Sequence, residues 1–145
     1  MIIAVDPGKM TGWARLNAAG SFESGEQSLY ATLYFIHETM KQGVGSKLEI
    51  ICEDFIFTKE TLKKSRQIYS TEGIGALRYL TELYDVPFYI QTPAAAKRFS
   101  SNEKLKQVGW YRPGRGHAND AARHLLLHAV KEGLVDTRQF ITEEI

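Results

Sequence analysis

The first 27 residues contain three strand-like segments joined only by short turns, and this spacing limits the possible folds more than any other feature. The segments are Met1–Val5, Thr11–Leu16 and Ser21–Gln27. Parallel pairing of adjacent strands needs a crossover of about a dozen residues, and neither connection is that long. The three segments are therefore predicted to form an antiparallel meander.

The rest of the chain alternates between helix-like and strand-like patterns. Leu48–Phe55 contains the apolar run Ile50-Ile51-Cys52, which is typical of a strand covered on both faces. Around this strand, apolar spacing and turn residues predict helices over 29–40, 66–84, 93–99 and 118–131, and an edge strand over 86–90. This order predicts an α/β fold with a mixed five-stranded sheet, in which parallel strands extend the meander and helices flank both faces.

Length and composition narrow the class of protein. The 145 residues suffice for one domain, expected to span 1–145, and 43% hydrophobic with 24% charged residues is ordinary globular usage. No apolar run reaches the roughly 18–20 residues of a membrane span, and the N-terminus lacks the pattern of a signal peptide. The single Cys52 excludes an internal disulfide and a multi-cysteine zinc site. We expect a soluble protein of the cytoplasm (of the host cytoplasm, if the chain is viral).

Positive charge is concentrated in two segments, although the formal net charge of the chain is only +1. Such asymmetry is typical of a protein that binds a polyanion, and solvated surface loops are the alternative interpretation. The candidate nucleic-acid contacts are Lys59, Lys63, Lys64 and Arg66 in the first segment, and Lys97, Arg98, Lys104, Lys106, Arg112 and Arg115 in the second.

Three acidic residues occupy positions at which sites are often built. Asp6 ends the first strand, Glu53 ends the buried strand, and Asp120 lies in the first turn of the last helix. If the first and fourth strands are neighbours, these carboxylates converge, and a divalent cation would relieve their repulsion. Oxygen ligands favour Mg²⁺ or Mn²⁺, and a pair of such ions can hydrolyse a phosphodiester. Asp120 by itself could equally be a favourable partner of the helix dipole.

Three histidines share the last helix with Asp120. His117 precedes Asp120 by three residues, so both lie on the same side of the helix, where His117 could ligate an ion or help to activate water. His124 and His128 are expected to form a polar face of the same helix, with His128 too far along it to reach a metal.

Three motifs resemble those of RuvC-type Holliday-junction resolvases. Ile3-Ala4-Val5-Asp6-Pro7-Gly8, with Thr11-Gly12-Trp13-Ala14 after it, resembles the first motif of the family, and Ile51-Cys52-Glu53 resembles the second. Gly116-His117-Ala118-Asn119-Asp120-Ala121 resembles the C-terminal motif. The motifs occur in the family's order, so the resemblance covers nearly the whole chain.

This resemblance implies an RNase H-like fold and a homodimer that nicks branched DNA with two Mg²⁺ or Mn²⁺ ions per active site. Asp6, Glu53, His117 and Asp120 would be the catalytic and metal-binding set. Lys97 and Lys104 fall where the family has basic residues that contact phosphate. The helix that contains Gly73 and Gly75 would form the dimer interface, and forks and flaps could be cut as well as four-way junctions.

One position departs from the family pattern. The family often has an aromatic wedge three residues after the glutamate, where this chain has Ile56. Phe57 is the preferred candidate for the residue that unstacks bases at the junction centre, and Phe55 is the other.

Other functions remain open on the sequence. The chain could be a YqgF-like nuclease acting on RNA, or a branched-DNA binding module without activity. An actin-like phosphate-binding fold also begins with Asp-x-Gly, but 145 residues leave no room for its second lobe.

Overall fold

The computed structural model describes residues 1–43, 47–56, 58–60 and 67–143. The strands are β1 (Ile2–Asp6), β2 (Met10–Leu16), β3 (Phe22–Ser28), β4 (Glu49–Glu53) and β5 (Phe88–Gln91). The helices are α1 (Leu29–Lys41), α2 (Gln67–Leu83), α3 (Pro93–Phe99), α4 (Asn102–Gln107), α5 (Gly116–Lys131) and the 3₁₀ helix η2 (Thr137–Glu143). No helix in this described part of the chain is both long and apolar enough to cross a membrane.

The five strands form one mixed sheet in the order β3-β2-β1-β4-β5. The first three strands pair antiparallel, and β4 pairs parallel with both β1 and β5. The predicted meander, the parallel extension and the edge position of the fifth strand are therefore confirmed. The fourth strand is shorter than predicted: it ends at Glu53, two residues before Phe55.

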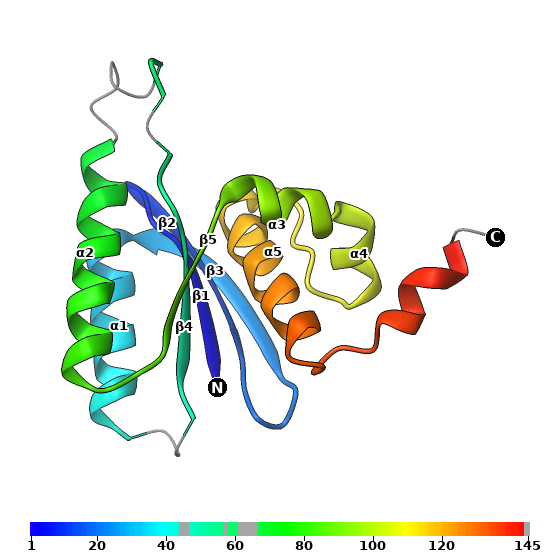
Figure 1. Cartoon of the computed structure of the whole chain (residues 1–145), viewed down its shortest axis with the longest axis horizontal. Coiled ribbons are helices and arrows are strands. Elements are labelled where there is room, and N and C mark those ends of the chain that lie inside the picture. Colours follow the sequence, from blue (N-terminus) through cyan, green and yellow to red (C-terminus); the bar gives the residue numbers. More distant parts are fainter. Residues whose placement is uncertain (44–46, 57, 61–66, 144–145) are drawn as a thin grey trace.

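Helices cover both faces of the sheet (Figure 1). The helices α1 and α2 lie against one face, and α5, with α3 and α4 beside it, lies against the other. Alternation along the strands supplies each face with its own core. Ile3, Val5, Ile50 and Cys52 pack with α1 and α2, whereas Ala4 and Ile51 pack with Leu125 and the other apolar residues of α5.

Small residues allow α5 to lie close to the sheet. Ala118, Ala121 and Ala122 are buried against it. At the start of the helix, a Cβ on Gly12 would lie only 1.9 Å from the backbone oxygen of His117. Only glycine at position 12 therefore permits the observed crossing of α5 over β2.

The two glycines of α2 have different surroundings. A Cβ on Gly73 would lie 2.6 Å from Cβ of Pro7, so this glycine serves a contact within the chain. A Cβ on Gly75 would meet nothing within 4 Å. Of the two glycines assigned to a dimer interface from the sequence, only Gly75 lies on an open surface.

Substitution of Gly12 tests the close crossing of α5 over β2. Gly12→Ala is expected to lower the free energy of unfolding by about 3 kcal/mol, because its methyl group overlaps the backbone of His117 and forces the helix away. The measurement is urea denaturation followed by circular dichroism. Gly116→Ala is the matched control, since a Cβ there meets nothing within 4 Å, and it should change the stability by less than about 1 kcal/mol. Equal stabilities of the two variants would contradict the assignment.

Candidate active site

One cavity of about 910 Å³ contains all four residues that the sequence singles out as catalytic. Its lining includes Asp6, Glu53, His117 and Asp120, and it extends past the β1–β2 turn to the start of α1 and the N-terminal part of α2. The four residues come from three elements, β1, β4 and α5. The fold thus brings together side chains that are up to 114 positions apart in the chain.

The register of the sheet places Asp6 beside Glu53. In the parallel pairing of β1 with β4, Ala4 lies opposite Ile51 and Val5 opposite Cys52. The next positions are Asp6 and Glu53, and both follow Ala4 and Ile51 by two residues, so both point to the α5 face of the sheet. Each side chain is mostly buried, with 17% and 18% of its surface exposed.

A glutamate of β3 fixes the start of α5. The Oε1 atom of Glu26 accepts hydrogen bonds from the backbone N–H groups of His117 (2.9 Å) and Ala118 (3.2 Å). Arg115, at the N-cap position, makes no capping bond with its own side chain. Glu26 therefore caps the helix from another element, with its negative charge at the positive end of the helix dipole.

The loop before α5 is also held in place. The side chain of Asn119 is buried, accepts a hydrogen bond from Arg112 N (2.9 Å) and donates one to Arg112 O (2.8 Å). Together with Glu26, this clamp determines where His117 and Asp120 enter the cavity. The role of Glu26 could not be predicted from the sequence, because a carboxylate that caps a distant helix leaves no local pattern.

Burial and neighbouring charges raise the pKa of Asp6 from its ordinary 3.8 to about 9. Desolvation is the largest cause, followed by repulsion from Glu53 and Asp120 and a hydrogen bond with the carboxyl group of Glu53. The positive charge of Lys97 acts in the opposite direction. The site therefore holds more negative charge than its protein surroundings balance.

The neighbouring polar groups partly engage the other carboxylates. Glu53 Oε2 lies 2.9 Å from His124 Nε2, and Asp120 Oδ1 accepts a longer hydrogen bond (3.4 Å) from Arg123 Nε. His117 Nδ1 lies 3.8 Å from Asp6 Oδ2, with about half of the His117 side chain exposed.

The donor set suits a hard divalent cation. Three carboxylates and an imidazole line one cavity, and the raised pKa of Asp6 means that a cation there would remove repulsion. As the side chains stand, no three His, Cys, Asp or Glu residues of the described ranges converge closely enough to form a ready ligand cluster.

The prediction that His124 and His128 form a polar face of α5 is wrong, because both side chains are buried. Their exposed fractions are only 1% and 4%. Each pairs instead with a glutamate of β4: His124 with Glu53, and His128 Nε2 with Glu49 Oε2 at 2.7 Å. Both glutamates lie on the same face of the strand as Ile51, so the strand and helix patterns together account for these pairs.

The predicted DNA contacts differ in how available they are. Lys59, Lys97, Arg98, Lys106 and Arg115 are exposed. By contrast, Lys104 Nζ lies 4.1 Å from the ring centre of Phe99 and donates to Phe99 O, and Arg112 donates to Gly109 O and Tyr111 O. Lys63, Lys64 and Arg66 lie outside the described residues.

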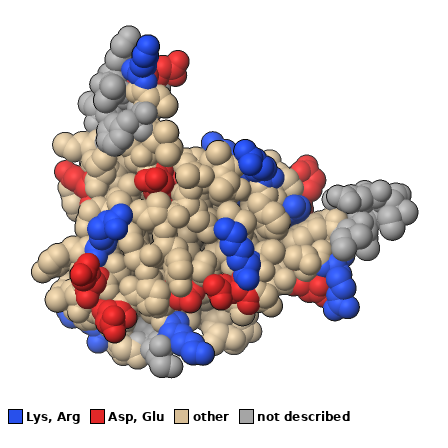
Figure 2. Space-filling view, in the orientation of Figure 1, with Lys and Arg blue, Asp and Glu red and all other residues tan. Residues whose placement is uncertain are grey.

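The basic side chains do not form one continuous patch on the face drawn in Figure 2. They are separated by neutral surface, and acidic groups lie between several of them. Basic residues that are close together in the sequence are therefore dispersed over this side of the molecule.

The candidate wedge residues follow β4. Phe55 is half-buried, and its backbone N–H donates to Asp54 Oδ1 (2.9 Å). Ile56 is exposed, whereas Phe57 lies outside the described residues.

Comparison with solved structures identifies the fold. A structure described as T. thermophilus RuvC in complex with a Holliday junction substrate superposes with a TM-score of 0.63 at 14% identity, over 92% of this chain and 96% of that chain. A second, described as Thermus thermophilus RuvC, gives a TM-score of 0.57 at 15% identity over the same shares. No protein-family model and no curated protein sequence matches the chain.

The protein therefore has a RuvC-type fold of the RNase H-like class. The fold inferred from the three motifs is confirmed, although the sequence shares only about one residue in seven with these structures.

Crowding of the carboxylates predicts that Asp6→Asn stabilises the protein when no divalent cation is added. The folded protein holds the proton of Asp6 up to about pH 9, whereas the unfolded chain releases it near pH 4. Relative to acid conditions, the folded wild type therefore loses stability as the pH rises from 4 toward 9, because its Asp6 must stay protonated while the unfolded chain releases the proton. The variant should exceed the wild type by on the order of 2 kcal/mol at pH 8 and match it at pH 4.

Thermal unfolding from pH 4 to pH 9 measures this difference. Addition of Mg²⁺ should raise the Tm of the wild type more than that of the variant, because the variant lacks one carboxylate. A variant less stable than the wild type at pH 8 without added cation would show that Asp6 is not under repulsion.

Proposed function

We propose that this protein is a metal-dependent, structure-specific endodeoxyribonuclease that nicks Holliday junctions. The observation that carries the proposal is that Asp6, Glu53, His117 and Asp120 line one cavity at the carboxyl ends of β1 and β4. The RuvC-type fold supports it, because a solved structure of that fold is described in complex with a Holliday junction.

In this proposal the four residues hold two Mg²⁺ or Mn²⁺ ions. When bound, such a pair supplies activation of water and stabilisation of the leaving oxygen in phosphodiester hydrolysis. Asp6 and Glu53 provide adjacent carboxylates from a rigid sheet, while Glu26 and Asn119 hold the start of α5 so that His117 and Asp120 face them. Lys97 adds a positive charge close enough to act on Asp6, and is suited to a phosphate beside the scissile bond.

We further propose that exposed basic residues near the cavity bind the DNA backbone. Lys97 and Arg98 lie in the last turn of α3, and Arg115 immediately precedes α5. Lys104 and Arg112 bind chiefly within the chain, so their contribution to DNA binding should be smaller. Binding to phosphate through these residues predicts an affinity that falls as salt concentration rises.

The proposal predicts symmetric nicks in a labelled four-way junction with Mg²⁺ or Mn²⁺ and none in linear duplex. Asp6→Asn should slow cutting by roughly a thousandfold or more while leaving junction binding intact, because it removes a ligand and not a DNA contact. Gel assays of cleavage and of mobility shift measure the two properties separately. A near-normal rate of cutting by the variant would overturn the assignment of the site.

The same assay separates the proposed function from its alternatives. Equal cutting of junctions, forks and flaps would indicate a general nuclease for branched DNA. Preferential cutting of RNA would support the YqgF-like reading. Tight binding to junctions without cutting in either metal would indicate a binding module.

We also propose that two copies of the chain associate through the outer surface of α1 and α2. Most of the large apolar side chains that are exposed in the described part of the chain lie there: Tyr30, Tyr34, Ile68, Tyr79 and Leu83. Several exposed large apolar side chains on one pair of helices are typical of an interaction site. A two-fold pair would match the symmetry of a four-way junction.

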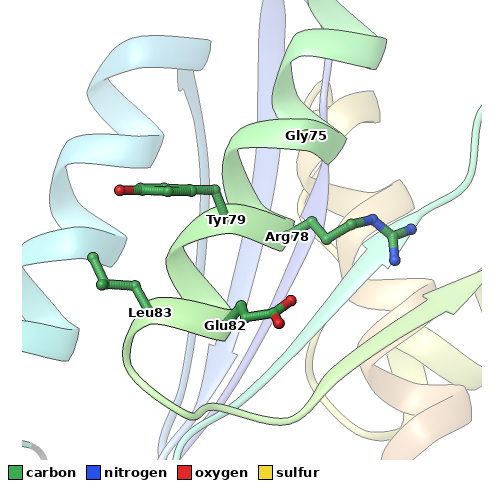
Figure 3. A pocket seen from close by; sticks show the side chains of 5 residues that line it. All are labelled: Gly75, Arg78, Tyr79, Glu82 and Leu83. Atoms are coloured by element: carbon green, nitrogen blue, oxygen red, sulfur yellow. The ribbon is translucent and has the colours of Figure 1, made fainter.

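A shallow cavity of about 450 Å³ lies on this surface of α2. Figure 3 shows Tyr79 and Leu83 extending to the side of α1, while Arg78 and Glu82 extend to the other side of the helix. Gly75, one turn before Tyr79, presents no side chain there, so another chain could approach the helix backbone closely.

Sedimentation equilibrium at micromolar concentration tests the interface. The wild type is expected to be a dimer, and Tyr79→Asp a monomer of unchanged helical content, because Tyr79 is 67% exposed and is not needed for the fold of one chain. Leu134→Asp is the control, since Leu134 is similarly exposed (59%) but follows α5. A monomeric wild type, or equal effects of both substitutions, would contradict the proposed interface.

A further inference from the structure

The buried side chain of His124 connects α5 to the ends of two strands. Its Nε2 atom lies 2.9 Å from Glu53 Oε2, and its Nδ1 atom lies 2.9 Å from Gln91 Oε1. Glu53 ends β4 and Gln91 ends β5, and the two residues are opposite each other in the parallel ladder. Both ring nitrogens are therefore engaged, and the imidazole cannot rotate without the loss of at least one of these contacts.

This clamp adds to the few contacts that hold the Glu53 side chain. A glutamate has three rotatable bonds, and besides His124 the carboxyl group of Glu53 shares a hydrogen bond with Asp6, whose charge it also repels. The backbone of β4 determines only the direction in which Glu53 leaves the sheet. The donor at His124 Nε2 determines where its Oε2 atom lies, and so where its other oxygen faces.

We propose that His124 is a positioning residue that fixes the carboxylate of Glu53 for cation binding and for strand cleavage. The inference rests on the proposed function, in which Glu53 is a metal ligand. Hydrogen bonds that orient ligating carboxylates commonly alter metal affinity by 10–100-fold when they are removed. His124 itself is 1% exposed and lies behind Glu53, so it acts through that residue and not on the DNA.

A second buried histidine–glutamate pair, His128 with Glu49, serves as a control that separates a structural role from a positioning role. His128 lies one turn further along α5, is 4% exposed, and bonds through Nε2 to Glu49 Oε2. Glu49 begins β4 and lines a different cavity, of about 370 Å³, together with Met1, Leu16 and Lys47. The two pairs share helix, strand, chemistry and burial, and they differ in distance from the candidate active site.

The experiment compares His124→Leu with His128→Leu. Each removes one buried histidine–glutamate bond. His124→Leu also removes the contact with Gln91, and His128→Leu removes the longer ion pair with Glu132 (3.9 Å), so both variants should lower the Tm. Only His124→Leu should weaken the binding of Mn²⁺, measured by calorimetry on the protein without DNA, by 10–100-fold. In junction cleavage the same variant should lower kcat with little change in KM, because the DNA contacts remain.

Two further variants keep the test decisive if a leucine variant does not fold. His124→Gln can place an amide donor near the position of Nε2, whereas His124→Asn reaches only the position of Nδ1. We expect Gln to retain Mn²⁺ affinity close to that of the wild type and Asn to lose it. Wild-type affinity in both His124→Leu and His124→Asn would overturn the proposal, as would equal weakening by His128→Leu.

Asp6→Asn distinguishes failure of this inference from failure of the proposed function. If Asp6→Asn loses Mn²⁺ binding while His124→Leu and His124→Asn keep it, the cation site stands and His124 has only a structural role. If the wild type and Asp6→Asn bind Mn²⁺ equally, the proposed function and the role of His124 both fail.

Discussion

The parallel pairing of β1 with β4 is the constraint on which the rest of the site depends. It sets two carboxylates side by side at the carboxyl ends of adjacent strands, on the same face of the sheet and mostly out of water. Burial, and after it repulsion from the neighbouring carboxylates, raises the pKa of Asp6 to about 9. The nearby polar groups are arranged around this repulsion: Lys97 reduces it, His124 holds Glu53, and Arg123 contacts Asp120.

The second requirement is that α5 reaches the same place. The first two turns of the helix approach the sheet closely because Ala118, Ala121 and Ala122 are small and because position 12 has no side chain. Hydrogen bonds of Glu26 and Asn119 then fix the first turn of the helix, and with it the positions of His117 and Asp120 in the cavity. A site built from strand ends and a helix start is rigid, and rigid placement is what charge stabilisation in catalysis needs.

The three histidines of α5 show how one helix can serve different ends. His117 is half-exposed beside Asp6, His124 is buried behind Glu53, and His128 is buried against Glu49, far along the strand. Buried polar groups are tolerated when they are paired, and both inner histidines are paired with carboxylates. In place of the expected polar face of the helix, the structure shows two buried bonds between helix and sheet.

The sequence by itself determined the antiparallel meander and the mixed sheet, because short connections leave few alternatives, and it indicated the four candidate site residues through their motifs. The proline before the fifth strand, Pro87, also indicated an edge position for β5. Pairing of β1 with β4 remained a condition that the structure met. Only the tertiary structure decided which groups surround those four residues. Glu26 and His124 bond to residues of distant segments, and such hydrogen bonds leave no periodicity in the chain. Likewise, two glycines in one helix look equivalent in sequence, and only packing shows that Gly73 meets Pro7 while Gly75 faces open space.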